Sequence, residues 1–368
     1  MMKDDSASYY DSQEFSELLE MYENMLSDGS SVYFDSMDIA NLAEYYSMNG
    51  DLDKSDAVIE YGLRLHPSDS DILISKAGNL LRRGQKEEAS VIAESIQDTD
   101  NQELLYLKGI IELAFDRTDT ADAYFTQAVE MSDDDPGMLN DIIVKYMDNR
   151  NYDLCQKWLD MALLLSPESR NFIELQADLF FDTGQSDTAI EWYNHLLDEF
   201  AYDTYYWEQL GRIYYEKNDF AQARECFEFI EAIDPENKSA RMMKASCIFC
   251  LEDWDEAYKI YKALLEEDPS SYTLLYYCGR CLYETGRYEE AYDKFLDTLA
   301  MLMLDPDVPQ EMFVELYAYL ANSAFRTNRS EQARRFLYEG LALDPDDEEL
   351  RQIASEILPK DENDLLTK

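Results

Sequence analysis

The sequence is poor in residues that break helices and in residues that build most catalytic sites. It contains only 12 Gly, 9 Pro and 2 His among 368 residues. Few Gly and Pro favour long helices over turn-rich β-structure. His66 and His195 lie far apart in the sequence, and neither a phosphate loop nor a G-x-S-x-G elbow is present. We therefore expect a non-catalytic protein without a cofactor.

Positive charge is also scarce. The chain has 31 Lys and Arg against 79 Asp and Glu, which gives a formal net charge of −48. Such a polyanion repels phosphate backbones and anionic lipid surfaces, so neither nucleic acid nor a membrane is expected as a partner. The charge can serve solubility alone, and the functional alternative is a basic partner.

Long apolar runs are missing. The first ten residues, MMKDDSASYY, contain no apolar core that could act as a signal peptide. Runs such as MALLL are too short to span a membrane. We therefore expect a cytoplasmic protein whose six cysteines are free thiols.

What the sequence does contain is a period of about 34 residues, the separation of Pro235 and Pro269. Small residues follow this step in two sets. The first set is Ser55, Ala89, Ala121, Cys155, Ala189, Ala223, Ala257, Ala291 and Ala333. The second set, twelve residues earlier in each period, is Ala43, Ala77, Gly109, Ala177, Gly211, Ala245, Gly279 and Ala321, interrupted by Ile143. Two such sets predict a pair of helices that cross closely in every period.

Further positions support the helix pair. Four residues after members of the first set comes a bulky one: Ile59, Phe125, Leu159, Tyr193, Phe227, Tyr261, Phe295 and Leu337. This is one helical turn on, so it fills the space beside the crossing. Between the helices of a pair lie residues that tolerate a left-handed backbone: Gly50, Gly84, Gly184, Asn218, Gly286 and Asn328. Prolines mark the end of the second helix in several periods.

These positions resemble those of tetratricopeptide repeats. The segment from Tyr205 to Pro235 is the best copy, with Trp207, Gly211, Ala223 and Phe227 at the family spacing. The resemblance implies an all-α fold, an α-solenoid that winds as a right-handed superhelix of about nine repeats. We place the array over 36–347, with repeats at 36–69, 70–101, 102–135, 136–169, 170–203, 204–237, 238–271, 272–305 and 314–347.

Segments outside the repeats are expected to cap the array, because each repeat buries its apolar face on a neighbour. Residues 1–35 form an acidic N-terminal segment with an amphipathic helix at 9–27. Residues 348–368 form a C-terminal capping helix and tail. The insertion at 306–313 is expected to lengthen a loop or the next helix.

Two C-x-x-C pairs, Cys247/Cys250 and Cys278/Cys281, raise the alternative of a zinc-dependent or enzyme-associated module. Both pairs lie inside expected helices, and Cys247 and Cys281 occupy equivalent positions in neighbouring repeats. We therefore interpret the cysteines as small packing residues. The segment DLDKSD at 51–56 lacks the glycine of a calcium loop and is interpreted as a helix start.

The resemblance implies that first helices line a concave groove, and aromatic residues recur there. We expect the groove to bind a protein or peptide segment, because aromatic residues and Arg dominate protein interfaces. Half-burial of the rings between helices is the alternative, and no Lys/Asn clamp for a terminal carboxylate is found. A structural subunit that meets a basic partner and a homo-oligomer remain further possibilities. The expected groove residues are Phe181, Tyr205, Arg212, Tyr215, Phe249, Tyr276, Arg280, Tyr283, Asn322, Phe325 and Arg326.

Overall fold

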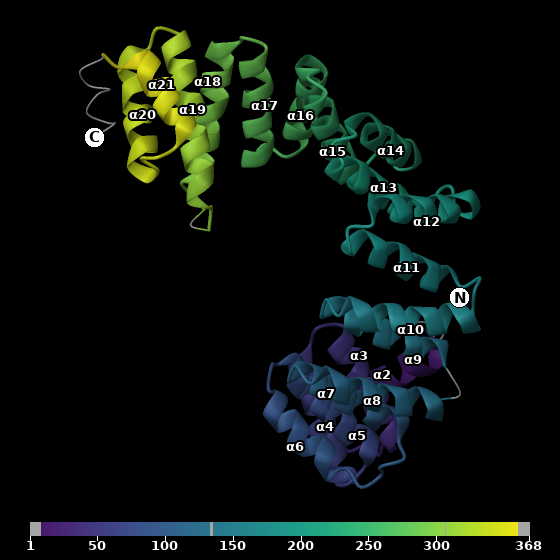
Figure 1. Ribbon diagram of the computed structural model, residues 1–368. Coiled ribbons are helices and arrows are strands. Elements are labelled where there is room, and N and C mark those ends of the chain that lie inside the picture. Colours follow the sequence, from purple (N-terminus) through teal and green to yellow (C-terminus); the bar gives the residue numbers. More distant parts are fainter. Residues whose placement is uncertain (1–8, 133–134, 306, 360–368) are drawn as a thin grey trace. The chain divides into compact units, whose positions relative to one another are not determined.

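The computed structural model describes residues 9–132, 135–305 and 307–359, which contain helices and no strand (Figure 1). The chain divides into two compact units, one up to Leu179 and one from Phe180 onward. The boundary falls within α11 (Arg170–Asp182). No helix in these described ranges is both long and apolar enough to cross a bilayer. Because its described residues form consecutive helices and no strand, the chain has the all-α fold of a helical-repeat solenoid, as expected from the sequence.

The helices follow one another as pairs joined by short turns. The first unit contains α2 (Gln13–Asp28), α3 (Ser36–Met48), α4 (Leu52–Leu65), α5 (Ser70–Arg82), α6 (Lys86–Ser95), α7 (Gln102–Ala114), α8 (Thr118–Met131), α9 (Pro136–Asp148) and α10 (Tyr152–Leu165). The second contains α12 (Ser186–Glu199), α13 (Thr204–Glu216), α14 (Phe220–Ile233), α15 (Lys238–Cys250), α16 (Trp254–Glu267), α17 (Tyr272–Glu284), α18 (Tyr288–Leu302), α19 (Gln310–Arg326), α20 (Ser330–Leu343) and α21 (Glu348–Ile357). From α3 to α20, odd-numbered helices are the first helices of pairs and even-numbered helices the second.

The short turn inside each pair carries one residue in the left-handed conformation, with φ between 54° and 78°. At Gly286, the turn closes through bonds from Gly286 N to Tyr283 O and from Arg287 N to Leu282 O. Gly and Asn at six of these positions agree with the sequence expectation. The other three were missed, because the same backbone bonds impose the conformation on Asp116, Arg150 and Glu252.

The small residues lie where the helices of a pair cross. Every member of the first small set is completely buried, from Ser55 to Ala333. Ser55 Oγ donates to the carbonyl of Ala43 at 2.7 Å, and Cys155 Sγ lies 3.8 Å from the carbonyl oxygen of Ile143. Each of these bonds joins residues twelve positions apart, so the helices touch at the predicted crossing.

Polar side chains link some neighbouring pairs in the first unit. Asn79 is buried and accepts from Ser47 Oγ at 3.1 Å, and its Nδ2 donates to Ser55 Oγ at 2.8 Å. Asp122 on α8 accepts from Trp158 Nε1 at 2.9 Å and from Lys157 Nζ at 2.6 Å on α10. These bonds are directional, so they specify which pairs can be neighbours.

Helices α2 and α21 pack against the first and the last helix pair. Helix α2 buries Phe15, Tyr22 and Met25 in the cluster that contains Ile39 and Leu42 of α3. Helix α21 buries Leu350, Ile353 and Ile357 in the C-terminal cluster. The parts of the expected caps at 1–8 and 360–368 lie outside the described residues.

The insertion before the last pair lengthens a helix. Helix α19 has 17 residues and begins at Gln310, whereas α17 has 13. Gln310 Nε2 donates to the carbonyl of Leu343 at 2.9 Å, which fixes the start of α19 against the end of α20.

Candidate functional site

The expected groove residues all lie in the second unit, on the first helices α11, α13, α15, α17 and α19. They are distributed as Phe181 on α11; Tyr205, Arg212 and Tyr215 on α13; Phe249 on α15; Tyr276, Arg280 and Tyr283 on α17; and Asn322, Phe325 and Arg326 on α19. The structure brings them together in several separate groups.

The first group joins α11 and α13. The guanidinium carbon of Arg212 lies 5.5 Å from the ring centroid of Phe181, a cation–π distance. Arg212 Nη1 donates to Gln209 Oε1 at 3.1 Å, and the side chain is exposed.

The second group joins α13 and α15. The Tyr215 hydroxyl lies 3.7 Å from Cys250 Sγ, and its ring packs edge-on against Phe220 with centroids 5.2 Å apart. Burial raises the pKa of Tyr215, and the contact with Cys250 adds to the effect. Tyr215 is therefore a neutral side chain that can present a ring face and a hydroxyl.

The third group, which we name the Arg280 cluster, consists of Phe249, Tyr276, Arg280, Glu315 and Tyr319. The guanidinium carbon of Arg280 lies 5.2 Å from the ring centroid of Phe249, 5.8 Å from that of Tyr276 and 4.8 Å from that of Tyr319. These rings come from α15, α17 and α19. The guanidinium is therefore held by residues of three consecutive first helices.

Hydrogen bonds complete the cluster. Arg280 Nη1 donates to the Tyr276 hydroxyl at 3.2 Å and to Glu315 Oε1 at 3.3 Å. The Tyr276 hydroxyl donates to the same Glu315 oxygen. Burial by itself would lower the pKa of Arg280, but Tyr276, Tyr319 and Glu315 raise it above its ordinary value. Arg280 Nε is buried without a partner, so the guanidinium is only partly satisfied.

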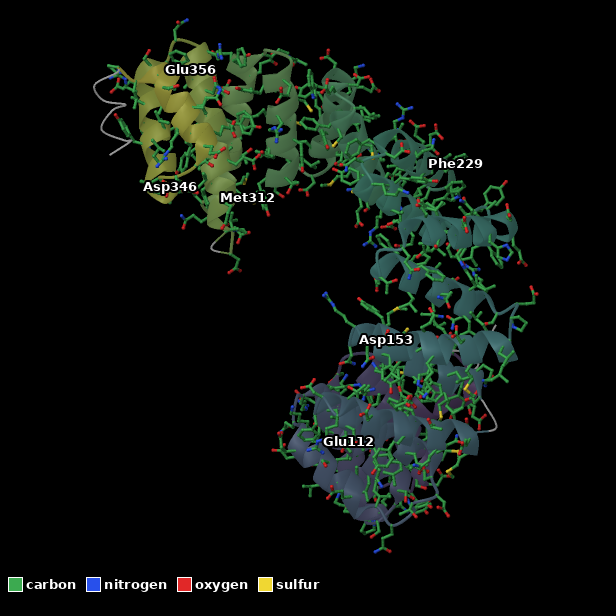
Figure 2. All side chains as sticks on the ribbon, in the orientation of Figure 1. Glu112, Asp153, Phe229, Met312, Asp346 and Glu356 are labelled. Carbon is green, nitrogen blue, oxygen red and sulfur yellow. The ribbon has the colours of Figure 1, made fainter. Side chains whose placement is uncertain are left out.

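Three further expected residues, Tyr283, Asn322 and Arg326, lie on α17 and α19. Tyr283 packs edge-on against Tyr319 with ring centroids 5.1 Å apart. Arg326 Nε donates to Asn322 Oδ1 at 3.2 Å, and Arg326 Nη2 lies 3.7 Å from the carboxylate of Glu356. Figure 2 labels Glu356, which belongs to α21.

Phe325 and Tyr205 are the two expected residues that lie outside these groups. Phe325 is half-buried and packs against the C-terminal core cluster. Tyr205, which is 40% exposed, contacts the ring of Tyr206 at a centroid distance of 5.8 Å.

The cysteines pack as apolar side chains. Cys247, Cys278 and Cys281 are buried, and burial raises the pKa of each thiol to about 12. Zinc binds the thiolate, which this burial disfavours. No group of His, Cys, Asp and Glu in the described ranges could hold a metal ion.

Sequence reasoning missed Glu315 and Tyr319, which are central to the Arg280 cluster. Tyr319 occupies the position of Tyr277 in the preceding repeat when the insertion is allowed for, so an alignment of that position could have found it. Glu315 has no such signal, because its role depends on how α19 approaches α17.

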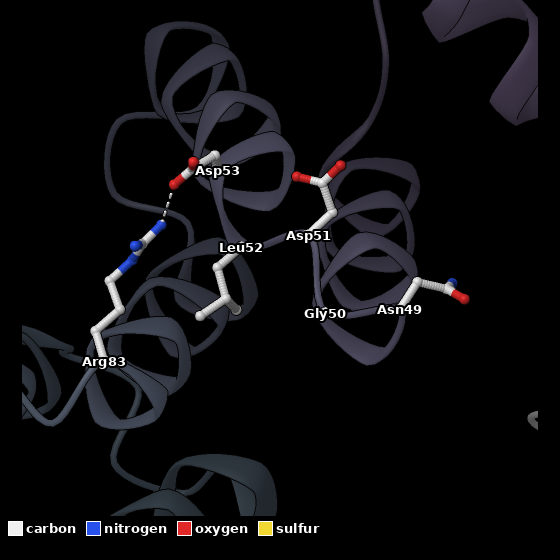
Figure 3. A pocket seen from close by; sticks show the side chains of 6 residues that line it. All are labelled: Asn49, Gly50, Asp51, Leu52, Asp53 and Arg83. Carbon is white, nitrogen blue, oxygen red and sulfur yellow. Dashed lines mark hydrogen bonds and ion pairs between the residues drawn. The ribbon is translucent and has the colours of Figure 1, made fainter. Parts of the chain in front are cut away.

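A separate polar pocket of about 370 Å³ lies in the first unit (Figure 3). Its walls are the turn from Asn49 to Asp53 and the side chain of Arg83. Arg83 Nη2 pairs with Asp53 at 2.6 Å and with Asp56 at 2.9 Å. Asp51 caps α4 by accepting from Lys54 N at 3.1 Å, which confirms a helix start here. The charged groups of this pocket are thus engaged with one another.

Comparisons with known proteins each cover a part of the chain. One relative is the human protein O-mannosyl-transferase TMTC1, 24% identical over 169 residues, which are 46% of this chain and 18% of that protein. The chain thus matches about a fifth of the length of this relative. Similar solved structures include a tetratricopeptide repeat protein from Parabacteroides merdae, with 16% identity, a TM-score of 0.46 and coverage of 69% of this chain and 97% of that one. Another is YrrB, described as a TPR protein with an unusual peptide-binding site, with 17% identity, a TM-score of 0.45 and coverage of 54% and 97%.

Two family profiles match the second unit. The profile described as "Anaphase-promoting complex, cyclosome, subunit 3" matches residues 230–298. The profile described as "Tetratricopeptide repeat" matches residues 204–237, which contain α13 and α14. The same helix pair, with its buried small residues and left-handed turn, recurs from α3 to α20. The chain is a tetratricopeptide-repeat protein.

Proposed function

We propose that this protein is a non-catalytic scaffold in the cytoplasm, and that it holds an extended protein or peptide segment along the first helices of its second unit. Tetratricopeptide-repeat folds in general serve as scaffolds for protein interaction, and the finer assignment rests on the Arg280 cluster. In this cluster a guanidinium contacts three aromatic rings and pairs with one carboxylate. Arg and aromatic side chains of this kind are typical anchors of protein interfaces.

The aromatic side chains along this face suit a binding role. Phe181, Tyr215, Phe249 and Tyr283 are all half-buried, so each ring keeps part of its surface in solvent. Rings offer rigid apolar area at a low cost in side-chain entropy, and tyrosine adds a hydroxyl that can donate to a peptide carbonyl. A segment laid across successive first helices would meet a ring on each of them.

The test separates binding from packing. A display library of random 12-residue peptides is selected on the purified protein, and affinities of the enriched peptides are measured by fluorescence anisotropy. Tyr215→Ala and Tyr283→Ala should each weaken binding by about 5- to 150-fold, the effect of losing an interface anchor of about 1–3 kcal/mol. Thermal melts of the same variants report any loss of packing.

Phe229→Ala is the matched control. Phe229 is 50% exposed but lies on the second helix α14, stacked on Trp207 with ring centroids 4.4 Å apart (Figure 2). This change should leave peptide affinity intact. Loss of melting temperature with unchanged affinity in Tyr215→Ala and Tyr283→Ala would assign these rings to packing and contradict the proposal.

A second candidate function is a structural subunit that docks on a basic partner. Its support is the net charge of −48 and the exposed acids on first helices of the first unit, among them Glu103 and Asp141. Although both residues are exposed at the surface, the surrounding protein partly desolvates their carboxyl groups and raises the pKa of both, and the charges of Asp71 and Glu44 raise that of Glu103 further. A steep loss of partner binding with added salt would favour this function over aromatic anchoring.

A further inference from the structure

We propose that Arg280 and Tyr276 form a binding site for one carboxylate, that Glu315 fills this site in the free protein, and that an acidic residue of the bound segment takes the place of Glu315. This inference rests on the proposed scaffold function and names the chemistry that the segment brings. The protein would then bind its ligand by exchange of an internal carboxylate for an external one.

The donors of the site converge on a single oxygen. Arg280 Nη1 lies 3.3 Å from Glu315 Oε1, and the Tyr276 hydroxyl donates to that same atom. Both hydrogen bonds gain strength from the negative charge of the acceptor. The rings of Phe249 and Tyr319, 5.2 and 4.8 Å from the guanidinium carbon, limit how far Arg280 can turn. The site is thus preorganised for a carboxylate, and the structure contains one there.

Glu315 satisfies this site incompletely. It is bonded through Oε1 alone, although an arginine can bind both carboxylate oxygens side by side. Arg280 Nε has no partner at all. The Glu315 side chain is 47% exposed, whereas that of Arg280 is 22% exposed. An outside carboxylate can therefore approach from the solvent side, and its bonds to Arg280 and Tyr276 would replace those that Glu315 gives up as it turns into water.

The insertion explains why Glu315 lies here. Helix α19 gains a first turn that begins at Gln310 and is anchored to the carbonyl of Leu343. Glu315 follows this added turn, and Tyr319 lies one turn further along the same helix. One element therefore supplies both the carboxylate that fills the site and a ring that walls it.

Neighbouring charges restrict the ligand further. Glu284 on α17 and Glu349 on α21 act on Tyr319 together with Glu315 and Arg280, so the surroundings of the site are acidic. A strongly acidic segment would be repelled by these carboxylates. We therefore expect the ligand to carry a single Asp or Glu between apolar or basic residues.

The experiment uses the random 12-residue display library on the full chain and on two variants, Glu315→Gln and Arg280→Gln. The strongest enriched peptide is then synthesised with its acidic residue and with the matching amide. On the unaltered protein the amide peptide should bind at least 10-fold more weakly, because a hydrogen bond to a charged group is lost. Glu315→Gln should bind the acidic peptide several-fold more tightly, because the internal competitor has lost its charge.

Arg280→Gln should bind the acidic and amide peptides about equally. Arg335→Gln is the control, because Arg335 is an exposed arginine on the second helix α20 that pairs with Glu339 at 2.8 Å. It should behave like the unaltered protein. If Arg280→Gln fails to fold by circular dichroism, Glu315→Gln alone decides the matter.

The outcomes keep the two proposals apart. Failure to enrich any peptide on the unaltered protein would overturn the scaffold proposal. Enriched peptides that bind equally well as acid and amide, or weaker binding by Glu315→Gln, would overturn the carboxylate site and leave the scaffold function standing.

Discussion

A Cβ atom added to Gly279 on α17 would lie 2.6 Å from Cε1 of Phe295 on α18. Carbon atoms do not approach so closely in folded proteins, so the ring of Phe295 occupies the space that a side chain would need. The same relationship holds between Gly109 and Phe125 and between Gly211 and Phe227, at 2.4 and 2.8 Å. In these pairs of helices glycine lets the large ring reach the opposing backbone.

Gly279→Ala should therefore destabilise the protein. The completely buried Phe295 ring would have to shift, and overpacking of this kind costs about 1–3 kcal/mol. The measurement is the free energy of unfolding in denaturant. Gly78→Ala is the control, because the added Cβ would meet only the flexible end of Arg82 at 3.4 Å. This substitution also replaces a glycine inside a helix, which favours the folded state. Equal effects of the two substitutions would contradict this account of the crossing.

Glu252→Gly should stabilise the protein by about 0.5–1 kcal/mol. Glu252 adopts φ 64° in the turn between α15 and α16, where a side chain strains the left-handed backbone. Gly286→Ala, at φ 76° with nothing near its Cβ, should cost about 1–2 kcal/mol through the backbone alone. Melting temperatures of both variants check the prediction, and a fall with Glu252→Gly would show that the Glu252 side chain has a contact worth more than the strain.

Native protein should show one reactive thiol out of six. Cys250 is the half-exposed cysteine, whereas Cys155, Cys226, Cys247, Cys278 and Cys281 are buried. Titration with a thiol reagent at neutral pH should give one fast equivalent and release the other five only in denaturant. Cys250→Ser should abolish the fast equivalent. Two or more fast thiols in the unaltered protein would mean that a helix pair opens readily.

Lowering the pH from 7 to 5 should raise the melting temperature. Burial and neighbouring acids raise the pKa of Glu103 above its ordinary 4.5, and Glu349 behaves alike. The folded state then binds protons more readily than the unfolded state, so stability falls as pH rises through the raised pKa. Glu103→Gln should flatten this response.

The matched control for pH is Glu267→Gln. Arg241 lowers the pKa of Glu267, so the stability that this group contributes is lost only below its ordinary 4.5. Between pH 7 and 5 this variant should respond to pH like the unaltered protein. A melting temperature that stays constant or falls between pH 7 and 5 in the unaltered protein would contradict the prediction.

The fold could be predicted because its determinants are local and repeated. Ala223 and Gly211 stand twelve residues apart, and the crossing that they permit recurs with the period. The turns could be predicted only where the residue prefers the left-handed backbone. Arg150 and Glu252 have no such preference, since hydrogen bonds at the end of the preceding helix impose the conformation on them.

The candidate site could be predicted only in part. Arg280, Phe249 and Tyr276 were recognised by position, and the structure brings them together. Glu315 could not be found, because the insertion shifts the period just where α19 begins. Whether an arginine faces solvent, as Arg212 does, or is engaged, as Arg280 is, depends on contacts between helices that periodicity does not describe.

Repeats that meet through apolar side chains can be exchanged for one another, because contacts between methyl groups and rings are less directional than hydrogen bonds. The interface of the first two helix pairs is different, since Asn79 bonds to Ser47 and Ser55 in the interior. Beside a repeat with apolar residues in place of Ser47, Ser55 and Asp56, the Asn79 amide would be buried without partners, at a cost of about 1–3 kcal/mol. We therefore expect the protein to tolerate copying or exchange of whole repeats between α13 and α18, and not at the first two helix pairs. The number of repeats can then change in the α13–α18 segment, whereas the order of the first two helix pairs is fixed.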